Sequence, residues 1–281
     1  MKTIDLPAAL SQWSRAVRDR GETIAFVPTM GFLHAGHLSL MREARTRGQH
    51  LVASIFVNPL QFGLNEDLDL YPRDAVGDAA SCRAEGVDVL FTPTRASLYP
   101  DGFQTTLKLG SLAGPLCGAS RPGHFEGMAT VVLKLFNLVR PTTAVFGNKD
   151  FQQLAIIRQM VRDLDLDVDI VGGPTVREPD GVAMSSRNAN LDEAQRLQAR
   201  ALSGALDLAE ELVEAGERGV EAIIAAAADL ITEQPLASID YVELVDADSL
   251  QVICDLERPG VMALAVRFGG TRLIDNRVLV P

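Results

Sequence analysis

The feature of this sequence that most constrains its fold is an alternation of apolar runs and helical patterns between residues 22 and 171. Apolar runs predict buried strands at 23–27, 50–57, 87–92, 142–146 and 167–171. Helical spacing of apolar residues predicts helices over 6–20, 38–47, 74–84, 125–139 and 151–163. Because strands that alternate with helices form right-handed crossovers, we expect an α/β fold with a doubly wound parallel sheet.

The pattern changes past residue 175. One long helix is expected over 191–214, facing the core with Leu191, Leu197, Leu202 and Leu206, and a second over 220–231. Three strand-like runs follow at 239–245, 261–268 and 272–280, the last two joined by a Gly-Gly hairpin signal. We therefore predict a first domain over residues 1–175 and a smaller α+β domain over 176–281.

Composition and charge exclude several classes of protein. The formal net charge of −11 argues against nucleic-acid binding, which needs a basic surface. No run of about eighteen apolar residues is present and no charged-then-apolar leader opens the chain, so we expect neither a membrane span nor a secretory signal. Cys82, Cys117 and Cys254 are far apart and lack metal spacing, so we expect reduced, buried thiols in a cytoplasmic protein.

Polar residues follow three of the predicted strands, at 29–37, 58–61 and 147–150. Ligands of doubly wound sheets bind beyond the carboxyl ends of the strands, so these clusters would line one crevice. The connection over 60–72 is long for a link between a strand and a helix, and such loops are often functional. A short strand is expected at 105–109.

Two histidines, His34 and His37, lie where the strand at 23–27 passes to the next helix. Three residues apart on a helix, they share a face. A helix start offers unpaired backbone N–H groups and the positive end of the helix dipole, and two imidazoles there can donate to phosphate oxygens. Spacing alone supports the alternative, one capping and one exposed histidine, equally well.

A second candidate phosphate site is Ser185-Ser186-Arg187, within the run 184–188. Two hydroxyls followed by a guanidinium suit a triphosphate, because the guanidinium fork matches phosphate oxygens. Taken alone, helix capping by the serines is the favoured alternative. The glycine-rich dinucleotide fingerprint and the Walker A loop are absent, so phosphate binding would depend on the histidines and scattered cations.

These two motifs resemble the two signatures of the adenylate-forming nucleotidyltransferase superfamily. His-Ala-Gly-His at 34–37 resembles its HIGH signature, and Met-Ser-Ser-Arg at 184–187 resembles its KMSKS signature with arginine as the cation. The surrounding residues resemble the pantothenate synthetase (pantoate–β-alanine ligase) family, in order, at 28–31, 56–62, 71–73, 121–125, 147–153 and 184–188. The resemblance implies a Rossmann-like domain that binds ATP and pantoate, and a C-terminal domain that carries the Met-Ser-Ser-Arg loop.

The reaction of that family has two steps. The pantoate carboxylate attacks the α-phosphate of ATP, which gives pantoyl adenylate and pyrophosphate, and the amine of β-alanine then displaces AMP. The resemblance thus implies pantoate, β-alanine and ATP as small-molecule partners, with Mg²⁺ bridging phosphate oxygens and its protein ligands unassigned. It also implies a homodimer, formed around residues 105–140, with no nucleic-acid or membrane partner.

The resemblance assigns site residues as well. His34, His37, Lys149 and Arg187 are the implied catalytic residues, because a carboxylate attacking a polyphosphate needs donors and positive charge. They belong to a larger implied set of ATP-binding residues, Met30, His34, His37, Gly147, Asn148, Lys149, Asp150, Val176, Met184, Ser185, Ser186 and Arg187. Within this set the serines face the β and γ phosphates, Asp150 and Gly147 the ribose, and the Val176 backbone the adenine.

Two glutamines are implied to bind the acid substrate. Gln61 matches a position that binds pantoate and β-alanine, and Gln153 one that binds pantoate. Without the resemblance, each would be an exposed surface amide. One departure concerns Asn148, where the family usually has glutamate or glutamine, so its side-chain contact differs; His124 lies in a family motif, and we assign it a structural or interface role.

Two other functions compete with the ligase. A nucleotidyltransferase of the same superfamily would join AMP to a phosphorylated acceptor and stop there. A non-catalytic nucleotide-binding module would bind ATP without releasing pyrophosphate, but the amide pair argues against it because mere binding needs no acid pocket. A tRNA synthetase is disfavoured by chain length and acidic charge.

Overall fold

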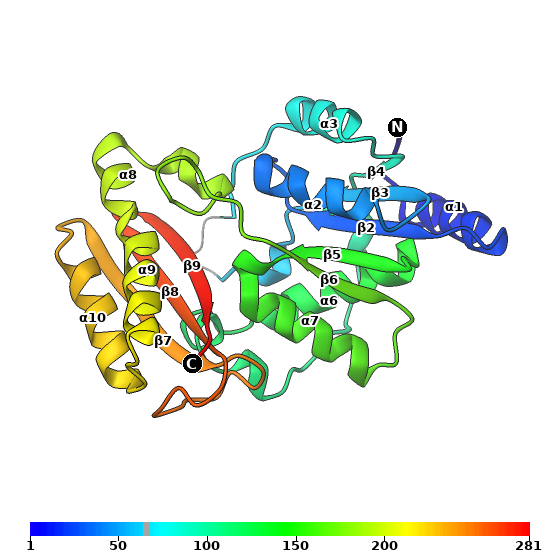
Figure 1. Cartoon of the computed structure of the whole chain (residues 1–281). Helices are drawn as coiled ribbons and strands as arrows, with labels where there is room; N and C mark the ends of the chain where they lie inside the picture. The colour runs from blue at the N-terminus through cyan, green and yellow to red at the C-terminus, as the bar shows by residue number, and fades with distance from the viewer. Residues whose placement is uncertain (64–67) are drawn as a thin grey trace. The chain divides into compact units, whose positions relative to one another are not determined.

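The computed structural model describes residues 1–63 and 68–281 (Figure 1). Part of the 60–72 connection, residues 64–67, lies outside the described residues. The chain divides into two compact units. Unit 1 comprises Met1–Leu109, Arg121–Asn148 and Gln153–Pro174; unit 2 comprises Gly110–Ser120, Lys149–Gln152 and Thr175–Pro281. Unit 2 thus includes two short segments that precede residue 175, and the single boundary at that residue stays a prediction.

Unit 1 contains a parallel sheet of six strands within its described residues, in the order β1-β4-β3-β2-β5-β6. The strands are β1 (Lys2–Ile4), β2 (Ile24–Thr29), β3 (His50–Ile55), β4 (Val89–Phe91), β5 (Thr143–Gly147) and β6 (Asp169–Gly173). The chain passes outward from β2 through β3 to β4 and then returns to β5, on the other side of β2. The predicted doubly wound α/β fold is confirmed, with its topological switch point between β2 and β5.

Helices cover both faces of this sheet, as the continuous apolar runs of its strands require. They are α1 (Pro7–Asp19), α2 (Ala35–Arg45), α3 (Ala75–Ala84), α4 (Arg95–Leu98), α6 (His124–Val139) and α7 (Phe151–Asp163), with a 3₁₀ turn η1 (Pro59–Gln61). Met41 of α2 and Cys82 of α3 pack with Ala25, Leu51 and Val145 on one face. Helices α1 and α6 contact each other and β2 on the opposite face.

Most sequence expectations for unit 1 agree with the structure to within a few residues. The expected strand at 105–109 is wrong, because this segment pairs with no described strand and the Leu107 N–H instead donates to Thr130 Oγ1 of α6, at 3.3 Å. Helix α2 begins at Ala35, three residues earlier than expected, which places His34 at its N-cap and His37 in its first turn. The three-residue β1 was not expected, since so short a run carries little pattern.

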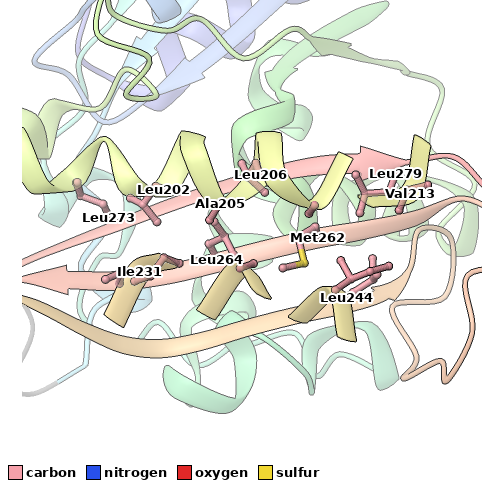
Figure 2. Packing of buried hydrophobic residues seen from close by; sticks show 14 of the residues in the cluster. Leu202, Ala205, Leu206, Val213, Ile231, Leu244, Met262, Leu264, Leu273 and Leu279 are labelled. Carbon is pink, nitrogen blue, oxygen red and sulfur yellow. The ribbon is translucent and has the colours of Figure 1, made fainter. Parts of the chain in front are cut away.

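Unit 2 is built on an antiparallel sheet in the order β7-β8-β9. Its strands are β7 (Ala237–Asp246), β8 (Gly260–Phe268) and β9 (Thr271–Leu279). Its helices are α5 (Cys117–Ser120), α8 (Glu193–Ala199), α9 (Ala201–Glu214) and α10 (Val220–Thr232), with 3₁₀ turns η2 (Ser111–Ala113) and η4 (Ser186–Asn190); a further 3₁₀ turn, η3 (Asn148–Asp150), begins on the last residue of a unit 1 segment. Figure 2 shows α9 and α10 packed on one face of this sheet through Leu206, Ile231, Leu264 and Leu273.

Two expectations for unit 2 are corrected. The single helix expected over 191–214 is interrupted at Arg200, so α8 is separated from α9 and Leu197 is 62% exposed rather than facing the core. Cys82 and Cys117 are buried free thiols as expected, but Cys254 is exposed. No helix among the described residues is long and apolar enough to cross a membrane.

Candidate active site

The site expected in unit 1 lies at the switch point of its sheet. The histidine turn, residues 30–37, follows β2, and Gly147 ends the neighbouring β5. The η1 turn carrying Gln61 follows β3, which pairs with β2 on its other side. Neighbouring parallel strands therefore place all three at the carboxyl edge of the sheet, where doubly wound folds bind ligands.

The histidine turn is a constrained piece of backbone. Gly31 has φ of 86° and Phe32 has φ of 51°, a conformation that costs a non-glycine residue energy. Asp78 of α3 offsets this cost, because its carboxylate accepts the N–H of Phe32 at 2.8 Å and that of Leu33 at 2.7 Å. Asp78 is only 3% exposed, and a Cβ on Gly31 would come within 2.9 Å of its Oδ2. The sequence therefore needs glycine at position 31 and a carboxylate at position 78.

The two imidazoles of this turn lie against each other. Their ring centroids are 4.0 Å apart, with an interplanar angle of 41°. The backbone N–H of His34 donates to Nδ1 of His37 at 3.3 Å. Because Nδ1 accepts this proton, a neutral His37 carries its own proton on Nε2. The turn thus places one histidine at the helix N-cap and provides an Nε2–H group that can donate to a phosphate. The capping and phosphate-binding interpretations of the motif are therefore compatible.

Gln61 is a buried amide, 7% exposed, and not the exposed side chain that the residue alone suggests. Its Oε1 accepts from Asn58 Nδ2 at 3.0 Å, and its Nε2 lies 3.4 Å from the Met30 sulfur. Its backbone carbonyl accepts from His124 Nδ1 at 2.8 Å and from Arg121 at 3.3 Å. His124 therefore has a structural role, as expected, and the amide of Gln61 has one defined orientation.

Asn58 is the residue that sets this orientation, whereas the sequence placed it only in the polar cluster at 58–61. It is 1% exposed, and its Nδ2 also donates to the Gly127 carbonyl at 3.0 Å. Tyr99 donates its hydroxyl to Asn58 Oδ1 at 2.8 Å, and burial raises the pKa of this tyrosine, which keeps it a donor. A Cβ on Gly127 would overlap the Leu60 carbonyl, so α6 packs directly against η1. An asparagine before a proline gives no signal of these distant contacts.

Asp78 is a second residue that the sequence analysis did not identify, although it supports the histidine turn. A usable signal was present, because Asp78 lies four residues before the buried Cys82 on the same face of a predicted helix. A carboxylate on the buried face of a helix needs hydrogen-bond donors. Both of its oxygens accept backbone N–H groups from the histidine turn.

The other predicted residues of unit 1 follow β5. Gly147 is the last residue of β5, Asn148 comes next, and Gln153 lies half-buried in the first turn of α7. A Cβ on Gly172 of β6 would overlap Oδ1 of Asn148. Gly172 thus leaves room for the side chain of Asn148, which lies against the edge strand β6.

The remaining predicted residues belong to unit 2 and are described within it. Lys149 and Asp150 are half-buried neighbours whose Nζ and Oδ1 atoms lie 4.0 Å apart. Val176 and Met184 are joined by a backbone hydrogen bond of 2.9 Å, so residues 176–184 form a hairpin. The Ser-Ser-Arg turn, residues 184–188, follows this hairpin. Ser185 caps η4 by accepting the N–H of Arg187 at 3.2 Å, so the capping alternative is present in the structure.

Charged side chains outside the motif support the Ser-Ser-Arg turn. Arg196 of α8 donates to Asp180 at 2.7 and 2.8 Å and to Glu178 at 2.9 Å. Glu178 in turn accepts from Asn188 Nδ2 at 2.7 Å, and Asn188 also donates to the Ala183 carbonyl. Hydrogen bonds from Arg196 hold the pKa values of Glu178 and Asp180 below their ordinary values. Ion pairs therefore join the hairpin to α8, and hydrogen bonds from Asn188 join the hairpin to the turn.

The structure thus groups the predicted residues by unit, and their binding roles stay predictions. Unit 1 carries Met30, His34, His37, Gln61, Gly147, Asn148 and Gln153; unit 2 carries Lys149, Asp150, Val176, Met184, Ser185, Ser186 and Arg187. Across residues 1–63 and 68–281, no group of three or more histidine, cysteine or acidic side chains could hold a metal ion.

Comparison with known proteins gives a consistent result. The family model for pantoate-beta-alanine ligase matches residues 2–278. A pantothenate synthetase of Trichlorobacter lovleyi is 56% identical over 279 residues, 99% of each chain. A solved structure of pantothenate synthetase from Thermus thermophilus is 43% identical, with a TM-score of 0.94 over 100% of both chains. Pantoate-beta-alanine ligase from Francisella tularensis, solved with beta-gamma ATP and beta-alanine, is 33% identical, with a TM-score of 0.82 over 99% of this chain and 97% of that one.

Proposed function

Because the chain belongs to the pantoate–β-alanine ligase family, we propose that it condenses pantoate with β-alanine at the expense of ATP. The pantoate carboxylate attacks the α-phosphorus and pyrophosphate leaves, which gives pantoyl adenylate. The amine of β-alanine then attacks the acyl carbon, and AMP leaves. The observation that carries this proposal is the family match over residues 2–278, which includes both the histidine turn and the Ser-Ser-Arg turn.

The first step brings a carboxylate toward a polyphosphate, so catalysis must offset negative charge. His37 is proposed to donate from Nε2 to a phosphate oxygen, since its Nδ1 already accepts the His34 N–H. His34 caps the eleven-residue helix α2, whose N-terminus adds N–H groups and a positive dipole end. Both imidazoles thus act as phosphate donors.

Unit 2 is proposed to supply the fixed charges. Lys149 and Arg187 carry positive charge to the phosphates, and Ser185 and Ser186 donate hydroxyls to the β and γ groups. Asp150 is an acceptor and suits a ribose hydroxyl rather than a phosphate, as does the backbone at Gly147. The Val176 backbone, with Met184 beside it, faces the adenine, and Asn148 lies beside the nucleotide.

Gln61 is proposed to bind pantoate as a hydrogen-bond donor. Because its Oε1 accepts from Asn58, its NH₂ group is the part left to face a substrate oxygen. Met30, which lies 3.4 Å from that NH₂ group, and Phe62 would contact the methyl groups of pantoate. Gln153 binds a second pantoate oxygen, and Gln61 also contacts β-alanine.

Mg²⁺ is proposed to arrive with ATP and not as a resident metal. Residues 1–63 and 68–281 offer no cluster of three metal-ligating side chains, so these residues do not form a dedicated metal site. Mg²⁺ commonly binds through substrate phosphates with few protein ligands. The ion would neutralise phosphate charge, and the roles above belong to the protein's own side chains.

We further propose that the enzyme is a cytoplasmic homodimer. The three free cysteines fit a reducing compartment. The dimer contact is placed around residues 105–140 by the family resemblance. Light scattering of the purified protein at two concentrations checks the dimer: twice the 30.3 kDa chain mass supports it, and the single-chain mass contradicts it.

The function is tested by omission. The protein is incubated with ATP, Mg²⁺, pantoate and β-alanine, and AMP and pantothenate are measured while each component is left out in turn. Pantothenate should form only in the complete mixture, with one AMP per pantothenate. AMP transfer to a phosphorylated acceptor would instead indicate a nucleotidyltransferase, and ATP binding without any turnover would indicate a binding module.

A further inference from the structure

The edge strand β9 connects three separate segments of unit 2. Asn276 donates its side-chain N–H to the backbone carbonyl of Lys149, at 2.7 Å. The two residues are 127 positions apart, so this bond joins the last strand of the chain to the segment that carries Lys149 and Asp150. None of the family motifs in the sequence includes Asn276.

Arg272 contacts the other short segment, residues 110–120, from the same face of β9. Residues four apart in a strand point to one side, so Arg272 and Asn276 share the face opposite Leu273 and Leu279, which pack in the core. Arg272 contacts Cys117 Sγ at 3.6 Å and Ser120 Oγ at 3.2 Å. This face of β9 therefore contacts both short segments of unit 2, residues 110–120 and 149–152.

Gln152 ties these two segments together. Its Nε2 donates to the carbonyls of Leu112 and Pro115, at 2.9 and 2.8 Å, and its Oε1 accepts the N–H of Cys117 at 3.0 Å. Gln152 is 6% exposed. Residues 149–152 are thus attached to β9 directly through Asn276 and indirectly through residues 110–120.

The neighbouring residue, Asp275, supports the hairpin that leads to the Ser-Ser-Arg turn. Arg177 makes two hydrogen bonds to the Asp275 carboxylate, at 2.6 and 3.0 Å, and a third to the Gly181 carbonyl at 3.0 Å. Asp275 is 3% exposed, and its Oδ1 also accepts the N–H of Asn276 at 2.8 Å. Two consecutive residues of β9 thus contact the Lys149 segment and the 176–184 hairpin.

We propose that Asn276 is a positioning residue for ATP that acts by fixing the backbone of Lys149, an inference that rests on the proposed function. The half-buried Lys149 can direct its ammonium group to a phosphate only if its backbone is fixed. Errors of about 1 Å in the placement of a reacting or binding group can cost up to about 10²-fold in rate. Because Asn276 holds the main chain of Lys149 by its carbonyl, removal of the amide should change the use of ATP while the Lys149 ammonium group is kept.

The test compares Asn276→Ala with the wild type and with Gln251→Ala. Gln251 is a control within unit 2, because its side-chain amide also donates to a backbone carbonyl, that of Ser249 at 3.4 Å, but on the exposed surface. Asn276→Ala should raise KM for ATP roughly 10-fold, with KM for pantoate and β-alanine within about twofold. A thermal melt with and without ATP gives a second readout, in which ATP should stabilise Asn276→Ala less than the control.

A double-mutant cycle with Lys149→Ala separates positioning from general damage to the fold. If Asn276 acts through the Lys149 side chain, Asn276→Ala should change kcat/KM for ATP by less than about twofold once Lys149 is alanine. The proposal would be overturned if Asn276→Ala had equal effects in both backgrounds, or if its kinetics equalled those of Gln251→Ala. A wild type that makes no pantothenate would instead refute the proposed function, so the two failures are distinguishable.

Discussion

The histidine turn and the Ser-Ser-Arg turn are expected to bind the same polyphosphate, but the chain supports them differently. The first is fixed by main-chain hydrogen bonds to one carboxylate, Asp78, which is 3% exposed. The second is held through Glu178, which accepts from Asn188 and is paired with Arg196, and Arg196 also pairs with Asp180; these side chains are 25–31% exposed. The histidine turn is thus supported by main-chain hydrogen bonds to a buried carboxylate. The support of the Ser-Ser-Arg turn includes a network of partly exposed ion pairs.

The difference has consequences for stability and for motion. A buried carboxylate that accepts two backbone N–H groups is little affected by salt, and its loss leaves those donors without their partner. Partly exposed ion pairs are screened by salt and contribute little each. We therefore expect the histidine turn to be the more rigid of the two and the Ser-Ser-Arg turn to be the more adjustable, and four substitutions test this contrast.

The largest effect is expected from His37→Ala. Removal of its Nε2 donor should lower kcat by roughly 10²–10³-fold, similar to the loss of one oxyanion donor, because alanine cannot donate to the phosphate. Steady-state turnover with all three substrates measures the effect. Normal turnover would contradict the role of His37 and would remove the functional reason for a rigid first turn.

The support of the first turn is broken by Asp78→Ala. Loss of two hydrogen bonds to a buried carboxylate should lower the free energy of unfolding by roughly 2–4 kcal/mol. Asp74→Ala is the matched control on the same helix, where an exposed carboxylate accepts one N–H, from Gly77 at 2.9 Å, and about 1 kcal/mol is expected. Urea denaturation compares the two; equal losses would show that burial of Asp78 adds nothing.

The proposed role of Gln61 in binding pantoate is tested by Gln61→Ala. The loss of a donor to a charged substrate should raise KM for pantoate by roughly 10–100-fold, while KM for ATP stays within about twofold. Gln251→Ala, which removes an exposed amide of unit 2, is the control and should change neither KM value. A parallel rise in both KM values would refute the assignment of Gln61 to pantoate.

The smallest effect is expected from Arg196→Ala, which breaks the support of the second turn. Loss of its ion pairs should raise KM for ATP by about two- to fivefold, and this rise should diminish in high salt. Arg42→Ala, which removes an exposed ion pair with Glu85, is the control without an effect on ATP. If Arg196→Ala raised KM for ATP by a larger factor than that by which His37→Ala lowers kcat, the order of the two effects would be the reverse of the one predicted.

The same variant has a defined pH dependence. Arg196 holds the pKa values of Glu178 and Asp180 low, so their contribution to stability is present above the unfolded pKa values of about 4 and is lost as pH falls through the lower folded values. The stability difference between wild type and Arg196→Ala should therefore shrink as pH falls below about 4. Denaturation series at several pH values measure it, and a difference independent of pH would contradict this origin.

Much of the fold could be predicted because it depends on local pattern. Continuous apolar runs identify strands that are buried on both faces, and the alternation with helices determines that they are parallel. The position of the histidine turn follows from the same pattern, since it lies between a strand and a helix. The failures are local as well: residues 105–109 have strand-like composition but pair with no described strand, and Leu197 became exposed because the helix is interrupted at Arg200.

The supports of the site could not be predicted, because each joins residues far apart in the chain. Asp78 accepts from residues 45 and 46 positions away, and Asn58 donates to a carbonyl 69 positions away. Asn276 and Lys149 are 127 positions apart. Periodicity and spacing in a sequence indicate contacts between residues within a few turns of each other. These hydrogen bonds depend on the tertiary fold, which brings distant segments of the chain together.

The central claim is that an organic acid becomes an acyl adenylate before the amide forms. Pantoate labelled with ¹⁸O in both carboxylate oxygens can be incubated with the enzyme, ATP, Mg²⁺ and β-alanine, and the AMP analysed by mass spectrometry. Attack of the carboxylate on the α-phosphorus predicts that each AMP carries one ¹⁸O atom. Unlabelled AMP, or the appearance of ADP and labelled inorganic phosphate, would contradict it.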